Sequence, residues 1–154
     1  MFLVSDTLIE RQKKIRSFLP NDPAIAVLLA AADFEWTARR AILALGKSPT
    51  KEIHERMDKE RKGGLESLQN YWKIEVKPLF GKDLAAMIKD WEFFRNTAYK
   101  LRNKLIHGAT GSTSVQYATR AVESFLAASK VVADFAEEKG EPIYGRRIRR
   151  TKAR

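Results

Sequence analysis

Residues that begin and end helices recur along this chain, and they constrain its fold more than any other feature of the sequence. Asp22-Pro23 combines an N-cap acid with a proline in the first turn, and Gly46 ends the helix that this pair opens. Ser48-Pro49 starts another helix, and Gly63-Gly64 stops it. No stretch alternates apolar and polar residues well enough to predict a strand. We therefore expect an all-α protein.

The expected architecture is an up-and-down bundle of about four main helices with one or two shorter ones. The predicted helices run from Ser5 or Asp6 to before Pro20, from Pro23 to Leu45, from Ser48-Pro49 to Glu60, from Leu65 to Val76, from Asp83 to His107 and from Thr113 to Glu138. Thr113 and Gln116 resemble a capping box for the last of these helices. Residues 1–140 are expected to form the bundle, and residues 141–154 a basic, disordered tail.

Composition narrows the class of protein. With 154 residues the chain is long enough for one domain with its own core. It has no Cys and two His, so we expect no disulfide framework, no metal centre and no cofactor. The lack of Cys fits a reducing compartment, and no apolar run approaches the roughly 20 residues that span a bilayer. We therefore expect a cytoplasmic protein without a membrane segment.

Basic side chains are concentrated at the end of the chain. Lys and Arg number 29 against 19 acidic residues, a net charge of +10. Six cations lie in the last nine residues, among them Arg146, Arg147, Arg149 and Arg150, and the rest of the chain carries only +4. A basic tail of this kind attracts nucleic acid regardless of base sequence, but a solvated end that aids solubility has the same composition. Both interpretations stay open.

The helix expected from Pro23 carries an apolar stripe with an acidic residue on each side. At 100° per residue the stripe consists of Ile25, Leu28, Leu29, Ala32, Trp36 and Leu43. Asp33 and Glu35 lie on opposite shoulders of this stripe. Arg39 follows Glu35 by one turn, within reach of an i,i+4 ion pair.

Two arginines interrupt the apolar stripe of the helix expected from Asp83. The stripe consists of Leu84, Met87, Ile88, Trp91, Ala98, Leu105 and Ile106. Arg95 and Arg102 lie in its middle and share a face, because they are seven residues apart. An unpaired buried charge is costly, so such an arginine needs a carboxylate, a phosphate or water. Asp33 or Glu35 is the expected carboxylate, and one interpretation is a structural ion pair that sets helix register.

The end of the same helix carries residues suited to chemistry on a phosphodiester. The sequence there is Arg102-Asn103-Lys104-Leu105-Ile106-His107, and Gly108 makes His107 a residue of the last turn. Arginine holds a phosphate with a fixed fork of donors. Histidine has an unperturbed pKa of about 6.5, which suits proton transfer near neutral pH. Asn103 lies about 40° from His107 around the helix and is placed to orient the imidazole.

This pattern resembles the motif of the HEPN superfamily, in which an arginine, usually followed by a polar residue, precedes a histidine by four to six intervening positions. Here four residues separate Arg102 from His107, and Asn103 occupies the polar position. The small all-α chain and the acidic residues of an earlier helix agree with the resemblance. It implies a metal-independent endoribonuclease that acts on RNA as a homodimer, with the motif helices of two subunits facing one another.

The resemblance also implies a role for each residue. Arg102 would hold the scissile phosphate, and His107 would act as general base or acid while the ribose 2′-hydroxyl attacks to form a 2′,3′-cyclic phosphate. Asn103 would orient His107 or a phosphate oxygen. Glu35, in preference to Asp33, matches an acidic residue that often positions the motif arginine. Further candidates for RNA contact are Arg95, Arg39, Lys104 and the arginines of the tail.

Members of the family act as toxins, as anti-phage effectors or in RNA processing, and the sequence does not choose among these roles. Toxins paired with a nucleotidyltransferase antitoxin often carry a tyrosine two positions after the histidine, where this chain has Ala109. The resemblance therefore disfavours inhibition by modification at that position, and it allows an antitoxin that acts in another way.

A second class of function stays open beside the enzyme. In it, the chain is a non-catalytic HEPN-like bundle that binds RNA, nucleotide or a partner protein, and Arg102 belongs to a structural ion pair. Replacing His107 separates the two classes, because only the enzyme depends on its imidazole. The other histidine, His54, lies in a highly charged segment, and we expect it on a solvated surface.

Overall fold

The structure is a computed structural model that describes residues 7–60, 63–108 and 110–154, and every regular element in these ranges is a helix. The all-α class is therefore confirmed. The elements are α1 (Leu8–Ser17), α2 (Pro23–Leu45), α3 (Thr50–Lys59), α4 (Leu65–Tyr71), α5 (Lys77–Phe80), α6 (Leu84–Met87), α7 (Trp91–Phe93), α8 (Tyr99–Ile106) and α9 (Val115–Glu138), with π-helical stretches at Trp72–Val76 and Phe94–Ala98. None of the described helices is long and apolar enough to cross a membrane.

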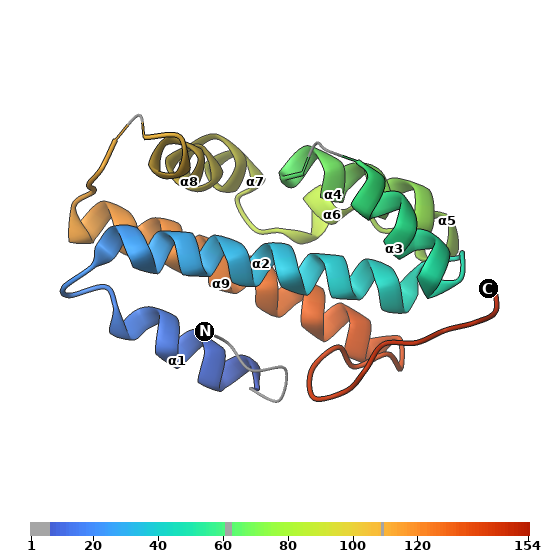
Figure 1. The fold of residues 1–154 in the computed structure, drawn as a ribbon. Coiled ribbons are helices and arrows are strands. Elements are labelled where there is room, and N and C mark those ends of the chain that lie inside the picture. The colour runs from blue at the N-terminus through green and yellow to red at the C-terminus, as the bar shows by residue number, and fades with distance from the viewer. Residues whose placement is uncertain (1–6, 61–62, 109) are drawn as a thin grey trace.

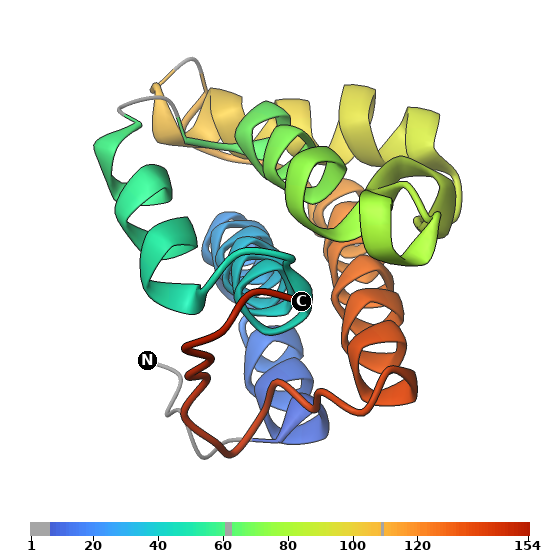
Figure 2. The same ribbon diagram turned by 90° about the vertical axis from the view of Figure 1, so that its right-hand side faces the viewer.

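The core forms between α2 and α9, which lie side by side and run in the same direction (Figure 1). Ala30 of α2 and Ala121 of α9 are fully buried, and such small side chains let two helices approach closely. Phe94 packs edge-on against Phe34 and Phe125, with ring centroids 4.9 and 5.3 Å away. α1 covers one side of the α2–α9 pair, and the segment from α3 to α8 covers another (Figure 2).

The apolar stripe predicted for α2 matches its buried face only in part, because Leu43 is buried and Leu29 packs against the core. Ile25 and Ala32 belong to the predicted stripe but are exposed, whereas Ala30, Phe34 and Ala38 are fully buried. A stripe drawn through the larger apolar residues misses the alanines at which the helices approach most closely. In addition, α1, α8 and α9 all contact α2, so buried positions extend around most of this helix.

The single helix predicted from Asp83 to His107 is divided in the structure. α6 ends at Met87, the backbone of Ile88 is extended, and Asp90 follows in the left-handed region with a φ of 51°. The Asp90 carboxylate accepts a hydrogen bond from the Phe93 N–H at 3.3 Å and caps a new helix. The π-helical stretch after α7 then widens one turn and rotates the faces of the residues beyond it.

This division changes which residues of the segment are buried. Phe94, Ala98, Tyr99 and Leu101 are buried, while Arg95 is exposed. The predicted placement of Arg95 in the middle of a buried stripe is therefore wrong. The prediction assumed one regular helix with 3.6 residues per turn. The break at Asp90 and the π-helical turn depart from that regular helix.

The starts of α1 and α9 also carry side-chain caps that differ from those expected from the sequence. Thr7 and Glu10 form a capping box at α1, because the side chain of each accepts the backbone N–H of the other, at 3.2 and 2.7 Å. The predicted starts at Ser5 and Asp6 lie outside the described residues. The capping box predicted at Thr113 is wrong, since α9 begins after Ser114, whose hydroxyl accepts the Tyr117 N–H.

The C-terminal segment, residues 141–154, packs against the bundle, contrary to the prediction of a disordered tail. It crosses the end of α2 (Figure 2). The Arg150 carbonyl accepts the Thr50 N–H at 2.9 Å, and the Arg154 guanidinium donates to the Ala44 carbonyl at 3.2 Å. Carbonyls in the last turn of a helix lack partners within the helix and carry partial negative charge. The arginines therefore bind protein groups that composition does not reveal.

The turn between α2 and α3 is built against Glu75, a buried residue of the first π-helical stretch. The Ser48 N–H and hydroxyl donate to the Glu75 carboxylate at 2.9 and 3.0 Å, and Arg56 pairs with the same carboxylate. Burial raises the pKa of Glu75, but the donors on Ser48 and Arg56 outweigh it and leave the pKa below its usual range. The close approach leaves no room for a side chain at Gly46.

We expect Gly46→Ala to destabilise the protein. A Cβ at this position would lie 2.5 Å from Cδ1 of Ile53 and 2.7 Å from the Ile42 carbonyl oxygen, and relieving such an overlap costs about 1–3 kcal/mol. Urea unfolding measures the change in the free energy of unfolding. Gly111→Ala is the matched control, because a Cβ there meets no atom within 4 Å. Equal stability of the two variants would contradict the packing described for this turn.

Candidate functional site

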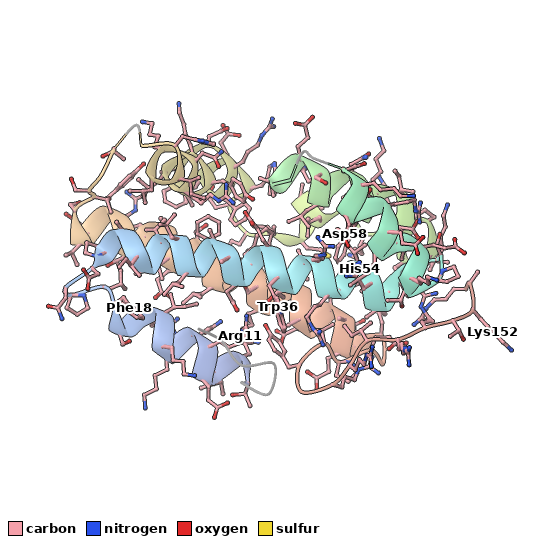
Figure 3. The ribbon with its side chains drawn as sticks, in the orientation of Figure 1. Arg11, Phe18, Trp36, His54, Asp58 and Lys152 are labelled. Atoms are coloured by element: carbon pink, nitrogen blue, oxygen red, sulfur yellow. The ribbon has the colours of Figure 1, made fainter. Side chains whose placement is uncertain are left out.

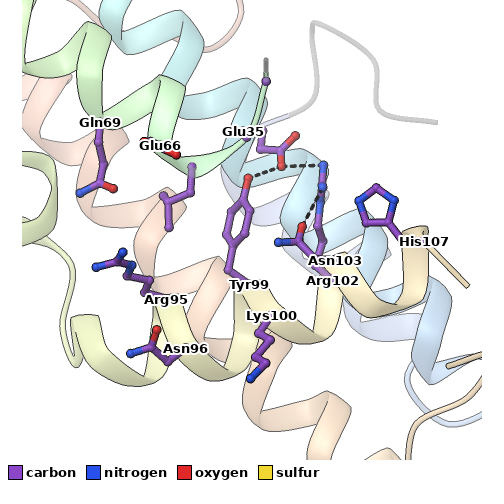
Figure 4. Close-up of a pocket in the computed structure, with 13 residues that line it drawn as sticks. Glu35, Glu66, Gln69, Arg95, Asn96, Tyr99, Lys100, Arg102, Asn103 and His107 are labelled. Atoms are coloured by element: carbon purple, nitrogen blue, oxygen red, sulfur yellow. Dashed lines mark hydrogen bonds and ion pairs between the residues drawn. The ribbon is translucent and has the colours of Figure 1, made fainter. Parts of the chain in front are cut away.

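A cleft of about 880 Å³ opens between α8 and the start of α4, beside α2 (Figure 4). It is lined by Glu35 of α2, by Gly63, Gly64, Leu65, Glu66 and Gln69 around the start of α4, and by Arg95, Asn96, Tyr99, Lys100, Arg102, Asn103 and His107. The Arg-Asn-His motif and the predicted acid Glu35 therefore share one cleft.

Glu35 is the carboxylate partner of Arg102. Its Oε1 lies 2.9 Å from Nη2 of Arg102, and the same oxygen accepts a hydrogen bond from the Tyr99 hydroxyl (Figure 4). The Arg102 guanidinium also lies 5.5 Å from the centre of the Tyr99 ring, within the range of a cation–π contact. Burial and the neighbouring Glu35 carboxylate raise the pKa of Tyr99, so its hydroxyl stays protonated and continues to donate.

Arg102 is anchored and yet retains donors for a ligand. Its Nη1 donates to Oδ1 of Asn103 at 3.0 Å, in addition to the ion pair with Glu35. A guanidinium has five N–H donors, so these two interactions leave others for an anion in the cleft. The Arg102 side chain is 20% exposed and Glu35 is 27% exposed. Partial burial of this kind strengthens a charge–charge interaction relative to one at an open surface.

Asp33, the other predicted partner of Arg102, has a different role. It is fully buried, and its Oδ1 accepts a hydrogen bond from Nε of Arg11 at 2.6 Å. The Arg11 guanidinium also lies 4.0 Å from the centre of the Trp36 ring, on the α1 side of α2 (Figure 3). Residues two positions apart on a helix differ by about 200° in direction, which is why Asp33 and Glu35 cannot both reach α8.

His107 lies at the C-terminal end of α8 with its side chain exposed to the cleft. Its backbone N–H donates to the Asn103 carbonyl at 3.0 Å, and Gly108 follows in the left-handed region with a φ of 69°. The imidazole lies beside the Arg102 side chain (Figure 4). No hydrogen bond joins the imidazole to another of the residues that the structure describes, so the ring keeps both nitrogens for a substrate.

The predicted use of Asn103 to orient His107 is not what the structure shows. The Asn103 side chain accepts a hydrogen bond from Arg102 instead. The interaction joins neighbouring residues of one helix, and its consequence is that Asn103 and Glu35 hold the guanidinium from two directions. A second function of Asn103, contact with a phosphate oxygen through its amide N–H groups, stays compatible with this position.

The other predicted cations of the bundle differ in their relation to the cleft. Arg95 lines it and is exposed, but Lys104 is not among its lining residues. The predicted ion pair between Arg39 and Glu35 is wrong, because Arg39 pairs with Asp58 of α3. Glu35 instead turns toward α8, where the interaction with Arg102 competes successfully with a pair along the surface of α2.

The arginines of the C-terminal segment fall into two groups. Arg146 binds the Pro142 carbonyl and the Glu141 carboxylate, and the Arg150 guanidinium binds the Ser48 carbonyl. The predicted RNA contacts therefore include two arginines that bind protein groups, Arg146 within its own segment and Arg150 at the turn between α2 and α3. The side chains of Arg147 and Arg149, in contrast, are exposed.

Sequence reasoning missed several residues of the cleft. Tyr99 precedes Arg102 by three positions and so lies on the same side of α8, a spacing that marks it as a neighbour. Lys100 lines the cleft as well, although the sequence analysis did not single it out. The residues around Gly63-Gly64 carry no comparable signal, because only the tertiary fold brings the start of α4 opposite α8.

Comparison of the chain with models of known protein families, with curated proteins and with solved structures finds no match. Within residues 7–60, 63–108 and 110–154, no three His, Asp or Glu side chains gather closely enough to hold a metal ion. The functional assignment therefore rests on the sequence motif and on the geometry of the cleft.

Removing the charge of Asp33 should lower the stability of the protein more than removing the charge of Glu35. We expect Asp33→Asn to destabilise the protein by about 3 kcal/mol, because it removes the negative charge from an ion pair whose two side chains are 2% and 0% exposed. We expect Glu35→Gln, at the partly exposed edge of the cleft, to cost less than about 1 kcal/mol. Urea unfolding of both variants measures the difference. An equal loss of stability would argue against separate roles for the two residues.

Proposed function

We propose that this protein is an endoribonuclease of the HEPN type, with a HEPN-like helical bundle, and that it cleaves RNA without a metal ion. The observation that carries the proposal is the arrangement of the cleft. An arginine is anchored by a carboxylate and still has free donors, and an exposed histidine lies beside it. The first can stabilise charge on the phosphate and the second can transfer a proton, and both contribute to cleavage of an RNA phosphodiester by its own 2′-hydroxyl.

In the proposed reaction, Arg102 binds a non-bridging oxygen of the scissile phosphate and stabilises the negative charge that develops there. The His107 imidazole takes the proton of the ribose 2′-hydroxyl as the 2′-oxygen attacks phosphorus. The bond from phosphorus to the 5′-oxygen of the next nucleotide breaks, and that oxygen receives a proton from a general acid. The products are a 2′,3′-cyclic phosphate and a 5′-hydroxyl.

The reaction favours a homodimer. A base and an acid act in the same step, and His107 is the one histidine among the described residues that line the cleft. A second copy of the chain, placed with its α8 facing the first, would supply the second imidazole and the second arginine. Such a site is composite, and each protomer alone is incomplete.

The proposal covers three biological roles that share this chemistry: a toxin, an anti-phage effector and an RNA-processing factor. An antitoxin or another regulator is a further proposed partner. Ala109, the position at which related toxins carry a modified tyrosine, lies outside the described residues.

A second candidate function is a non-catalytic helical module that binds RNA, nucleotide or a partner protein. The observation that favours it is the Glu35–Arg102 pair itself, since most of the Arg102 side chain is covered and an ion pair of this kind also stabilises a fold. Loss of the imidazole distinguishes the two candidates, because it leaves this pair intact.

We expect His107→Ala to lower the rate of RNA cleavage by roughly 10²–10⁴-fold, the usual contribution of a general acid or base. The assay uses labelled single-stranded RNA with excess EDTA, and it detects products that end in a cyclic phosphate. His54→Ala is the matched control. His54 lies on α3 with Nδ1 2.7 Å from the Asp58 carboxylate (Figure 3), and its loss should leave cleavage unchanged.

Two results would favour the binding module over the enzyme. One is cleavage by His107→Ala at the rate of the wild type. The other is absence of cleavage by a confirmed wild-type dimer on several unrelated RNAs, with RNA binding retained. Circular dichroism and light scattering establish that each variant keeps its helical content and its oligomeric state.

We expect the double variant Arg147→Gln, Arg149→Gln to bind RNA more weakly, because these exposed cations are placed to neutralise phosphates. Loss of two phosphate contacts on a single strand should reduce the slope of log K against log salt by about 1.4. Binding is measured by fluorescence anisotropy across a range of salt concentrations. The control carries Lys13→Gln and Lys89→Gln, which remove the same charge from other surfaces. An equal reduction in both variants would indicate an effect of net charge alone.

A further inference from the structure

We infer that a second hollow beside the Glu35–Arg102 pair binds an unpaired nucleobase, and that it favours guanine and uracil over adenine and cytosine. The inference rests on the proposed ribonuclease function and names the substrate feature that the protein would recognise. The hollow measures about 310 Å³ and is lined by Ala32, Glu35, Trp36, Arg39, Met57, Gly63, Gly64, Ser67 and Leu68.

The hollow is joined to the cleft of Arg102. Glu35, Gly63 and Gly64 line both, so the two spaces meet at the carboxylate that anchors the arginine. A phosphate bound by Arg102 would therefore lie next to the entrance of the hollow. Its volume is at the lower limit of small-molecule sites, which suits one splayed base and excludes a duplex. Sequence-specific proteins read single-stranded RNA through bases in this extruded form.

Three large apolar side chains form part of the wall of the hollow. Trp36, Met57 and Leu68 come from three different helices. The guanidinium groups of Arg11 and Arg40 lie 4.0 and 4.7 Å from the centre of the Trp36 ring and hold it in place. A planar base gains from burial against such walls, because it leaves water without requiring them to move.

The polar groups of the hollow determine which base fits. Both interactions of Glu35 use Oε1, so Oε2 keeps its capacity to accept a hydrogen bond. Arg39 uses one of its five N–H groups in its ion pair with Asp58, and the others are available as donors. The Glu35 carboxylate can accept a hydrogen bond from a ring N–H, and the Arg39 guanidinium can donate to a carbonyl. Together they match a base edge on which a ring N–H lies next to a carbonyl.

Guanine and uracil carry such an edge, whereas adenine and cytosine have no ring N–H on that edge at neutral pH. In adenine the acceptor beside the amino group is a ring nitrogen, and adenine has no carbonyl. A site that hydrogen-bonds a group of its ligand disfavours analogues that lack that group, because its own polar atoms then lose that partner. Glu35 and Arg39 are partly exposed, at 27% and 37%, so the expected discrimination is modest. Glu35 and Arg39 therefore favour guanine and uracil, whose edges carry a ring N–H beside a carbonyl.

The experiment is calorimetric titration of the full chain with the four nucleoside 3′-monophosphates. We expect GMP and UMP to bind at least about tenfold more tightly than AMP and CMP. Ala32→Phe should abolish this preference, because Ala32 is an exposed residue of α2 at the hollow and a larger side chain would occupy the space. Ala127→Phe places the same side chain at an exposed alanine of α9 and should bind as the wild type does.

Failure of this inference is distinguishable from failure of the proposed function. Equal affinity for the four nucleotides, or unchanged selective binding by Ala32→Phe, would overturn the base site. If RNA cleavage dependent on His107 were still observed, the ribonuclease would stand without the base site. Selective nucleotide binding by a wild type that cleaves no RNA would support the hollow and reject the enzyme. His107→Ala should retain selective binding, since His107 does not line the hollow.

Discussion

The close packing of α2 against α9 determines where the other parts of the molecule lie. Alanines at the contact bring the two helices together, and this sets the rotation of α2 about its own axis. Once that rotation is set, Asp33 points to α1 and Glu35 points to α8. The same helix therefore supplies a buried structural ion pair on one side and the anchor of the cleft on the other.

Glu35 both contributes to the packing of α2 against α8 and orients the arginine of the proposed reaction. One of its oxygens receives both the Tyr99 hydroxyl and the Arg102 guanidinium, so the arginine is oriented before any ligand enters. Preorganised charge of this kind stabilises a transition state without having to reorient during the reaction. The His107 imidazole makes no hydrogen bond to the residues that the structure describes, and its place at the end of α8 is set by the backbone.

In the C-terminal segment, arginines that composition alone would assign to nucleic acid bind groups of the protein itself. Arg150 and Arg154 bind carbonyls near the end of α2, and Arg146 binds groups of its own segment. Three of the cations that look available for nucleic acid are thus used by the protein itself. The exposed Arg147 and Arg149 keep the electrostatic role, on a segment whose path is set by backbone hydrogen bonds to the α2–α3 turn.

The sequence by itself determined the all-α class, the extent of α2 and the grouping of Arg102, Asn103 and His107 near one helix end. These follow from local causes. Pro23 and Gly46 act within a turn, residues three or four positions apart on a helix are neighbours whatever surrounds them, and Arg102 and His107 fall within the last two turns of one helix. Tertiary structure alone decided the break at Asp90, the choice of Glu35 over Asp33 and the ordering of residues 141–154. Each of these depends on groups far apart in the chain. The energy of such contacts exists only once the helices have packed, so no local pattern encodes it.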